Sequence, residues 1–116
     1  MTDLHAFVDS MKWNLYGAAN RVAWGDLRQP GEAERLRANS PLSLADKIVG
    51  PLLLAHGRHD KIVPRKHTEW MVEALEAEGR SPQVAYYEDW HGFIHQPNRI
   101  DFYSKLQAFL VECTSK

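Results

Sequence analysis

The sequence predicts an α/β protein built around an open, parallel β-sheet, and two features of residues 51–114 carry this prediction. Residues 51–55 form a continuous apolar run ending in His56-Gly57, as expected for a strand buried on both faces of a parallel sheet. The following segments indicate, in order, a helix, a strand, a polar loop and a helix, which is a right-handed parallel crossover unit with a terminal helix. Because only two strands are indicated, we expect an incomplete sheet.

Residues 1–39 indicate a helical and irregular excursion that precedes a sheet-and-helix core over residues 40–116. Four apolar residues at helical spacing predict a short first helix: Leu4, Phe7, Val8 and Met11. The next apolar residues follow no clean period, so we expect an irregular stretch containing Trp13, Leu15, Tyr16, Val22 and Trp24. A turn at residues 29–31 precedes a second short helix over residues 32–39.

The core begins with the apolar strand and continues with a helix over residues 65–78, which Gly79 is placed to end. One face of this helix carries His67, Trp70, Met71, Ala74 and Leu75. Residues 83–87 predict a second strand, and a polar loop over residues 88–97 follows it. In the last helix we expect Asn98 as the N-cap, Asp101 in the first turn, and one apolar face formed by Phe102, Leu106, Phe109, Leu110 and Cys113.

The composition is that of a globular domain, and it excludes several classes of protein. The chain has 116 residues, 44% of them hydrophobic, with 14 basic and 15 acidic side chains and a formal net charge of -1. This balance gives no basic surface for nucleic acid, and no apolar run approaches the about 18 residues of a membrane span. The single cysteine, Cys113, allows no internal disulfide, and residues 1–5 carry no secretory signal pattern. We therefore expect a cytoplasmic protein that binds neither nucleic acid nor membrane.

Six histidines invite a metal-site hypothesis, because imidazole is a good ligand for zinc, copper or nickel. The pairs His56/His59 and His91/His95 have suggestive spacings, but both fall at strand ends and loops. No cysteine cluster and no helical His-Glu-x-x-His motif fixes a ligand geometry. For His56, His67 and His95, packing or solvation is the favoured interpretation, and we expect no metal.

A second hypothesis concerns Asp60 and His91, which follow the two predicted strands. The carboxyl ends of parallel strands meet at one edge of a sheet, where open α/β folds keep their sites. The two residues are therefore candidates for neighbours although they lie 31 positions apart. A carboxylate beside an imidazole fixes its tautomer, as a general base serving a nucleophile requires. In the alternative interpretation, Asp60 caps the following helix and His91 is a turn residue.

These residues resemble the C-terminal part of the catalytic domain of the prolyl oligopeptidase family of serine peptidases. The likeness rests on His56-Gly-x-x-Asp60-x-x-Val63-Pro64, on the acidic loop leading to His91-Gly92-Phe93, and on residues 98–103 before an amphipathic helix. Residues 40–48 also resemble the family's approach to the strand. The resemblance implies an α/β-hydrolase fold in which Asp60 is the triad acid and His91 the triad base. Trp90 departs from the family, whose members usually carry a small residue before the histidine.

The nucleophile of such a triad is missing from the sequence. The nucleophile elbow is Gly-x-Ser-x-Gly, and none of the serines at positions 10, 40, 43, 81, 104 and 115 lies in it. Ser81 has Gly79 two residues before it but Gln83 two residues after it, so a turn is its simpler interpretation. Cys113 is expected in the core rather than as a nucleophile. The elements that form the oxyanion hole of this fold are absent as well.

The resemblance implies a C-terminal fragment of a serine hydrolase that cleaves peptide or acyl-aminoacyl bonds, with Gly92 and Phe93 shaping the histidine loop. It implies no metal or organic cofactor, and its partners would be a peptide or acylated amino-acid substrate and the missing N-terminal part of the domain. Two alternatives stay open: a non-catalytic module that binds through its sheet edge, and an esterase-type hydrolase of the same fold. Alone, we expect the chain to be inactive and prone to self-association through the exposed edge.

Overall fold

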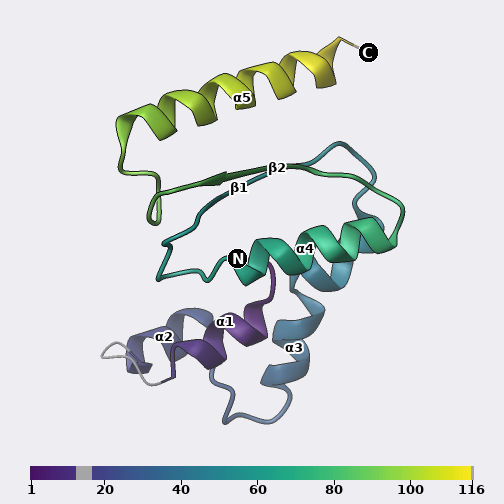
Figure 1. The fold of residues 1–116 in the computed structure, drawn as a ribbon. Helices are drawn as coiled ribbons and strands as arrows, with labels where there is room; N and C mark the ends of the chain where they lie inside the picture. Colours follow the sequence, from purple (N-terminus) through teal and green to yellow (C-terminus); the bar gives the residue numbers. More distant parts are fainter. Residues whose placement is uncertain (13–16, 116) are drawn as a thin grey trace.

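The structure, a computed structural model, describes residues 1–12 and 17–115. In these ranges the chain forms, in order, α1 (Leu4–Ser10), α2 (Gly17–Trp24), α3 (Glu32–Ala38), the 3-10 helix η1 (Pro41–Lys47), β1 (Leu53–Gly57), α4 (Lys66–Ala77), β2 (Gln83–Tyr87) and α5 (Gln96–Thr114). Figure 1 shows the two strands side by side with α5 on one face of the sheet and α4 on the other. The first three helices lie beyond α4. The order of elements from β1 to α5 is the one the sequence predicts.

The sheet is parallel, with Leu53 opposite Gln83 and Gly57 opposite Tyr87. This register brings the carboxyl ends of both strands to the same edge, so the loops that follow β1 and β2 start next to each other. Gly57 is needed at this point, because a Cβ there would lie 2.4 Å from the carbonyl oxygen of Trp90 and 2.6 Å from that of Asp89.

The core lies between the sheet and α4. Ala45 from η1 and Met71 and Leu75 from α4 form its buried centre. The half-buried side chains packed against them are Ile48, Leu52, Leu54 and Ala74. The apolar run before His56-Gly57 and the predicted face of the helix therefore meet, which explains why these elements form together.

The N-terminal helices are attached to this core through buried polar groups. Ser40 accepts a hydrogen bond from the backbone N–H of Leu4 at 2.8 Å and donates one to the carbonyl of Leu36, also at 2.8 Å. The buried ring of His67 accepts from the backbone N–H of Asp3 at 3.3 Å through Nδ1, and Thr2 donates its hydroxyl to the His67 carbonyl. Burial lowers the pKa of His67, which keeps its ring neutral for this role.

Two predictions about local structure are wrong. The irregular stretch expected after the first helix is helical over α2, because Gly17–Trp24 is rich in alanine and needs no apolar period to form a helix. Trp24 then packs edge-to-face on Phe7 with ring centroids 5.7 Å apart. Trp13, Leu15 and Tyr16, expected in the same stretch, lie outside the described residues.

The start of the last helix also differs from the prediction. α5 begins at Gln96 with His95 as its N-cap, and proline stands in its first turn, where a missing N–H costs nothing. Asn98 is therefore inside the helix, and its side chain bonds Asp89 instead of capping. Asp101 lies beyond the first turn and accepts a hydrogen bond from Tyr87. On the predicted apolar face, Leu110 is exposed and the other four residues are half-buried.

Candidate active site

The loops that follow β1 and β2 bring Asp60 and His91 together at the carboxyl edge of the sheet. His91 Nδ1 lies 2.8 Å from Asp60 Oδ2 and donates a hydrogen bond to it. The Asp60 side chain is only 7% exposed, whereas the His91 side chain is 53% exposed. The acid is thus fixed inside the loop, and the imidazole stands at the surface.

Asp60 is oriented by its own loop. Its Oδ1 accepts the backbone N–H groups of Ile62 at 2.8 Å and Val63 at 2.9 Å, which leaves Oδ2 for the histidine. Burial by itself raises the pKa of the Asp60 carboxyl. The hydrogen bonds from Val63, His91 and Ile62 outweigh it, so this pKa lies below its usual value and the group is a carboxylate at neutral pH.

His56, a buried residue of β1, supports the Asp60 loop. Its Nε2 lies 2.8 Å from the carbonyl oxygen of Val63, and its Nδ1 lies 2.7 Å from the hydroxyl of Thr68 in α4. A carbonyl can only accept, so Nε2 carries a proton and donates to Val63, while Nδ1 and the Thr68 hydroxyl form the second bond. His56 is therefore a buried residue whose two hydrogen bonds link the Asp60 loop to α4, in agreement with the packing interpretation.

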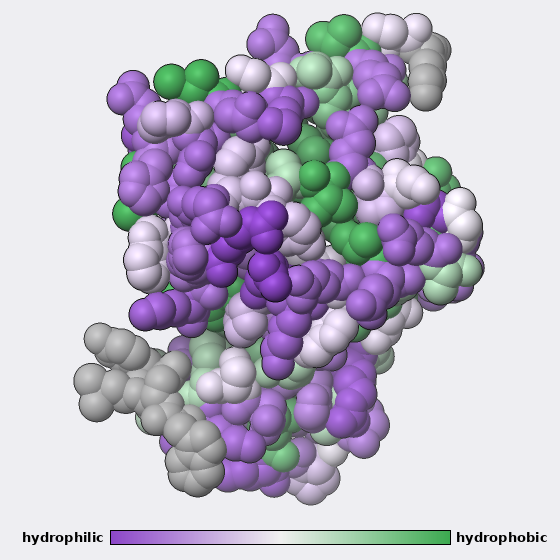
Figure 2. All heavy atoms as spheres, viewed as in Figure 1, coloured by the Kyte–Doolittle hydropathy of each residue, from purple (hydrophilic) through white to green (hydrophobic). Residues whose placement is uncertain are grey.

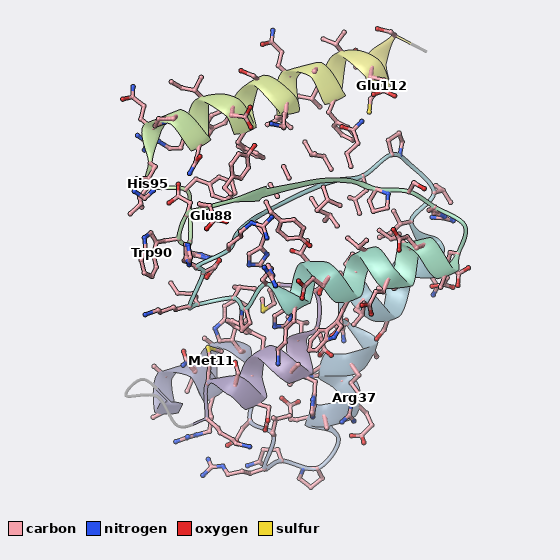
Figure 3. All side chains as sticks on the ribbon, viewed as in Figure 1. Met11, Arg37, Glu88, Trp90, His95 and Glu112 are labelled. Carbon is pink, nitrogen blue, oxygen red and sulfur yellow. The ribbon has the colours of Figure 1, made fainter. Side chains whose placement is uncertain are left out.

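Asp89 holds the histidine loop, a role that is not predicted from the sequence. Its fully buried carboxylate accepts the backbone N–H groups of Trp90, Ile94 and His95 at 2.8 to 3.1 Å and the side-chain amide of Asn98 at 2.9 Å. The ring of His95 lies 3.0 Å from the same group. Burial by itself raises the pKa of Asp89, but these bonds hold it well below the usual range. Figure 3 shows His95, Trp90 and Glu88 around this loop, between β2 and α5.

A pocket of about 180 Å³ opens against the Asp60–His91 pair. Its lining consists of Met1, Ala55, His56, Gly57, Asp60, Val63, Trp90, His91, Gly92 and Phe93. None of these residues carries a hydroxyl or a thiol. Among the described residues, the pocket lining therefore combines a carboxylate and imidazoles without a hydroxyl or thiol group.

The sequence comparisons assign the family. The profile of the prolyl oligopeptidase family matches residues 2–116. The chain belongs to the prolyl oligopeptidase family. It is 31% identical over 90 residues to dipeptidyl aminopeptidase BIII of Pseudoxanthomonas mexicana, and 24% identical over 94 residues to dipeptidyl peptidase family member 6 of Caenorhabditis elegans. These matches cover 77% and 80% of this chain but only 13% of either relative.

Solved structures of peptidases share the fold of this prolyl oligopeptidase family chain. A puromycin-hydrolyzing peptidase of Mycobacterium tuberculosis superposes on 97% of it with a TM-score of 0.82 and 23% identity. An acylaminoacyl peptidase of Pyrococcus horikoshii superposes on 89% with a TM-score of 0.70 and 21% identity. The chain covers 17% of each of these structures, so it is a piece of the α/β-hydrolase fold, as predicted.

The other histidines of this family member do not assemble a metal centre. His59 bonds Glu88 at 2.9 Å, and His95 pairs with Asp89. Among residues 1–12 and 17–115, no three His, Cys, Asp or Glu side chains are grouped so that they could hold a metal ion. In the same ranges, no helix combines the length and the apolar character needed to cross a membrane.

Ser81 and Cys113 lie away from the pocket. Ser81 is in the connection between α4 and β2, after Gly79 in a left-handed conformation, as the turn interpretation predicts. Cys113 is half-buried near the end of α5.

Proposed function

We propose that Asp60 and His91 are the acid and the base of a serine-hydrolase triad, and that this chain is part of a peptidase that cleaves peptide or acyl-aminoacyl bonds. The observation that carries the proposal is the 2.8 Å bond between His91 Nδ1 and Asp60 Oδ2 at the edge of a pocket. With Nδ1 donating, the neutral ring presents a lone pair at Nε2, and no described residue bonds that atom. This is the atom that a serine hydroxyl would meet.

In this mechanism His91 Nε2 takes the proton of a serine hydroxyl while its oxygen attacks the substrate carbonyl. It then gives the proton to the leaving amine as the carbon–nitrogen bond breaks, and water repeats the sequence to release the acyl group. Asp60 stabilises the imidazolium that forms between these transfers. The serine and the oxyanion hole would come from the remainder of a hydrolase domain, so we expect the chain to be inactive alone.

The short coverage of the relatives supports this proposal, because the chain matches only 13% of the length of either peptidase. The natural partner would then be the preceding part of the same domain, which would pair with the free edge of the two-stranded sheet. Self-association through that edge is the competing outcome for the isolated chain.

A fluorophosphonate that labels activated serines tests the proposal. The chain alone should stay unlabelled, and a serine-bearing N-terminal part of a domain of this family should become labelled only when the chain is added. His91→Ala should abolish the labelling, and Asp60→Asn should reduce it strongly. His5→Ala removes a histidine of α1 outside the pocket and serves as the control. Labelling that survives His91→Ala, or labelling of the chain alone, would refute the proposed roles.

A further inference from the structure

Lys61 and Trp90 meet beside the Asp60–His91 pair. Lys61 directly follows the acid and Trp90 directly precedes the histidine. The Lys61 ammonium lies 5.4 Å from the centroid of the Trp90 ring, a cation–π distance. The His59 ring packs against the same indole with centroids 5.8 Å apart. Trp90 also lines the pocket, so its indole connects Lys61 to the pocket.

The charges at this rim are unevenly paired. Arg58 and His59 share Glu88, at 3.0 Å and 2.9 Å. Lys61 has no carboxylate within ion-pair distance among the described residues, so the indole face is its nearest partner. Cation–π contact leaves the outward side of the ammonium free to bind an anion, and the neighbouring Asp60 is already occupied by His91 and two backbone N–H groups. Lys61 thus offers a positive charge next to Trp90 that no described carboxylate pairs.

The side of the substrate that this charge faces follows from the chemistry of the dyad. His91 must deliver its proton to the leaving amine, so the leaving group lies next to the imidazole. Trp90 lines the pocket together with His91, and Lys61 lies against its indole, so both are placed near the residues that follow the bond to be cleaved. In a short peptide, those residues end in a free carboxylate.

Resting on the proposed function, we infer that Lys61 and Trp90 form a leaving-group subsite that binds the C-terminal carboxylate of a short peptide. The indole holds the ammonium in place and gives an apolar surface to the departing residue. The subsite favours peptides with one or two residues after the cleaved bond over longer or amidated ones.

Binding of leaving-group products to the full chain tests this inference without a serine. The probes are the dipeptide alanylalanine and its C-terminal amide, and the readout is the NMR shift of the Trp90 indole N–H, assigned with Trp90→Phe. We expect the dipeptide to bind about two- to fivefold more tightly than the amide, the size of an exposed ion pair. Lys61→Gln should bring this ratio to one, and Lys61→Arg should largely restore it.

Lys66→Gln is the matched control, because Lys66 also lies against an indole, 5.1 Å from the ring of Trp70, and Trp70 does not line the pocket. It should leave the ratio unchanged. A ratio that survives Lys61→Gln, or no shift of the Trp90 signal, overturns the inference. Alanylglutamate α-amide carries its only carboxylate on the side chain, and Lys61-dependent binding as tight as that of alanylalanine would also overturn it. The fluorophosphonate experiment does not use Lys61, so failure of the proposed function shows there and failure of the subsite shows here.

Discussion

The helices α4 and α5 lie on opposite faces of the same sheet, yet only α4 has fully buried residues. α4 has 12 residues and buries His67, Thr68, Met71 and Leu75, whereas α5 has 19 residues and buries none. A strand of five residues is about 17 Å long, while a helix of 19 residues is about 28 Å long. α5 therefore extends past the small sheet, and helical length alone does not supply a core.

The two helices also differ in what surrounds them. α4 is enclosed by the sheet and η1, but α5 leaves Ile100, Tyr103, Leu110 and Val111 more than half exposed. Figure 2 shows hydrophobic side chains at the surface over the sheet and along α5. A hollow of about 580 Å³ on α5, larger than the pocket at the dyad, includes Ile100 and Tyr103 in its lining but no acid–base pair. The burial of a helix thus depends on the elements packed around it, and within this chain α4 has such elements on more than one side.

Leu75→Ala should have the largest effect, because Leu75 is 1% exposed at the centre of the α4 core. Removing a buried leucine side chain costs the transfer free energy and leaves a cavity, for a loss of about 2 to 5 kcal/mol in the free energy of unfolding. Urea unfolding followed by circular dichroism measures it. A loss below about 1 kcal/mol would mean that this core is loosely packed in solution.

The loop between β2 and α5 should unfold in acid before the α4 core does. The pKa of Asp89 is lower in the folded chain than in the unfolded chain. Its hydrogen bonds therefore stabilise the fold fully at pH values above about 4, the ordinary pKa of an aspartate. That stabilisation is lost as the pH falls from about 4 toward the folded-state pKa.

Amide exchange or NMR signals of residues 88–98, recorded from pH 6 to pH 2, measure this opening. Asp89→Asn keeps the shape of the side chain but removes the charge, and it should make the loop open at neutral pH with little dependence on acid. A loop that keeps the pH dependence of the unchanged chain in Asp89→Asn would contradict the assignment.

Tyr87→Phe should have a moderate effect, because it removes one polar contact between the sheet and α5. The Tyr87 hydroxyl donates to Asp101 Oδ2 at 2.8 Å. Burial, together with this bond and the charge of Asp101, raises the pKa of Tyr87 to about 12. Loss of one such hydrogen bond typically costs about 1 kcal/mol, measurable by urea unfolding. The pH titration of tyrosine absorbance should lose its last step in the same variant, and an unchanged titration would exclude Tyr87 as its source.

The difference between α4 and α5 explains what could be predicted from the sequence. The strands and α4 were predictable because the apolar run before His56 packs against the buried face around Leu75 within this chain. The run is half-buried rather than buried on both faces as predicted, because the described sheet has only two strands. The meeting of Asp60 and His91 followed from the parallel order of the strands, since topology alone brings both loops to one edge. Their catalytic roles stay a prediction.

The remaining features depend on contacts that no local pattern encodes. Asp89 lies two residues before His91, but its partners include Asn98, nine positions away, so its role in organising the loop could not be predicted from the local sequence. The same contact withdraws Asn98 from the predicted cap. Leu110 fits the apolar period of α5 but has no covering element in the described structure, so periodicity predicted a face without predicting its burial.

Leu110→Gln should have the smallest effect on stability of the four substitutions. The side chain is 51% exposed on α5, and substitutions at such surface positions usually change the free energy of unfolding by less than about 0.5 kcal/mol. Urea unfolding beside Leu75→Ala gives the contrast between the two helices, and sedimentation velocity reports any association through α5. If Leu110→Gln weakens association while leaving monomer stability unchanged, the exposed face mediates contacts between molecules. A loss above about 1 kcal/mol in a monomeric sample would instead show that α5 is packed as closely as α4, because only a buried leucine costs that much.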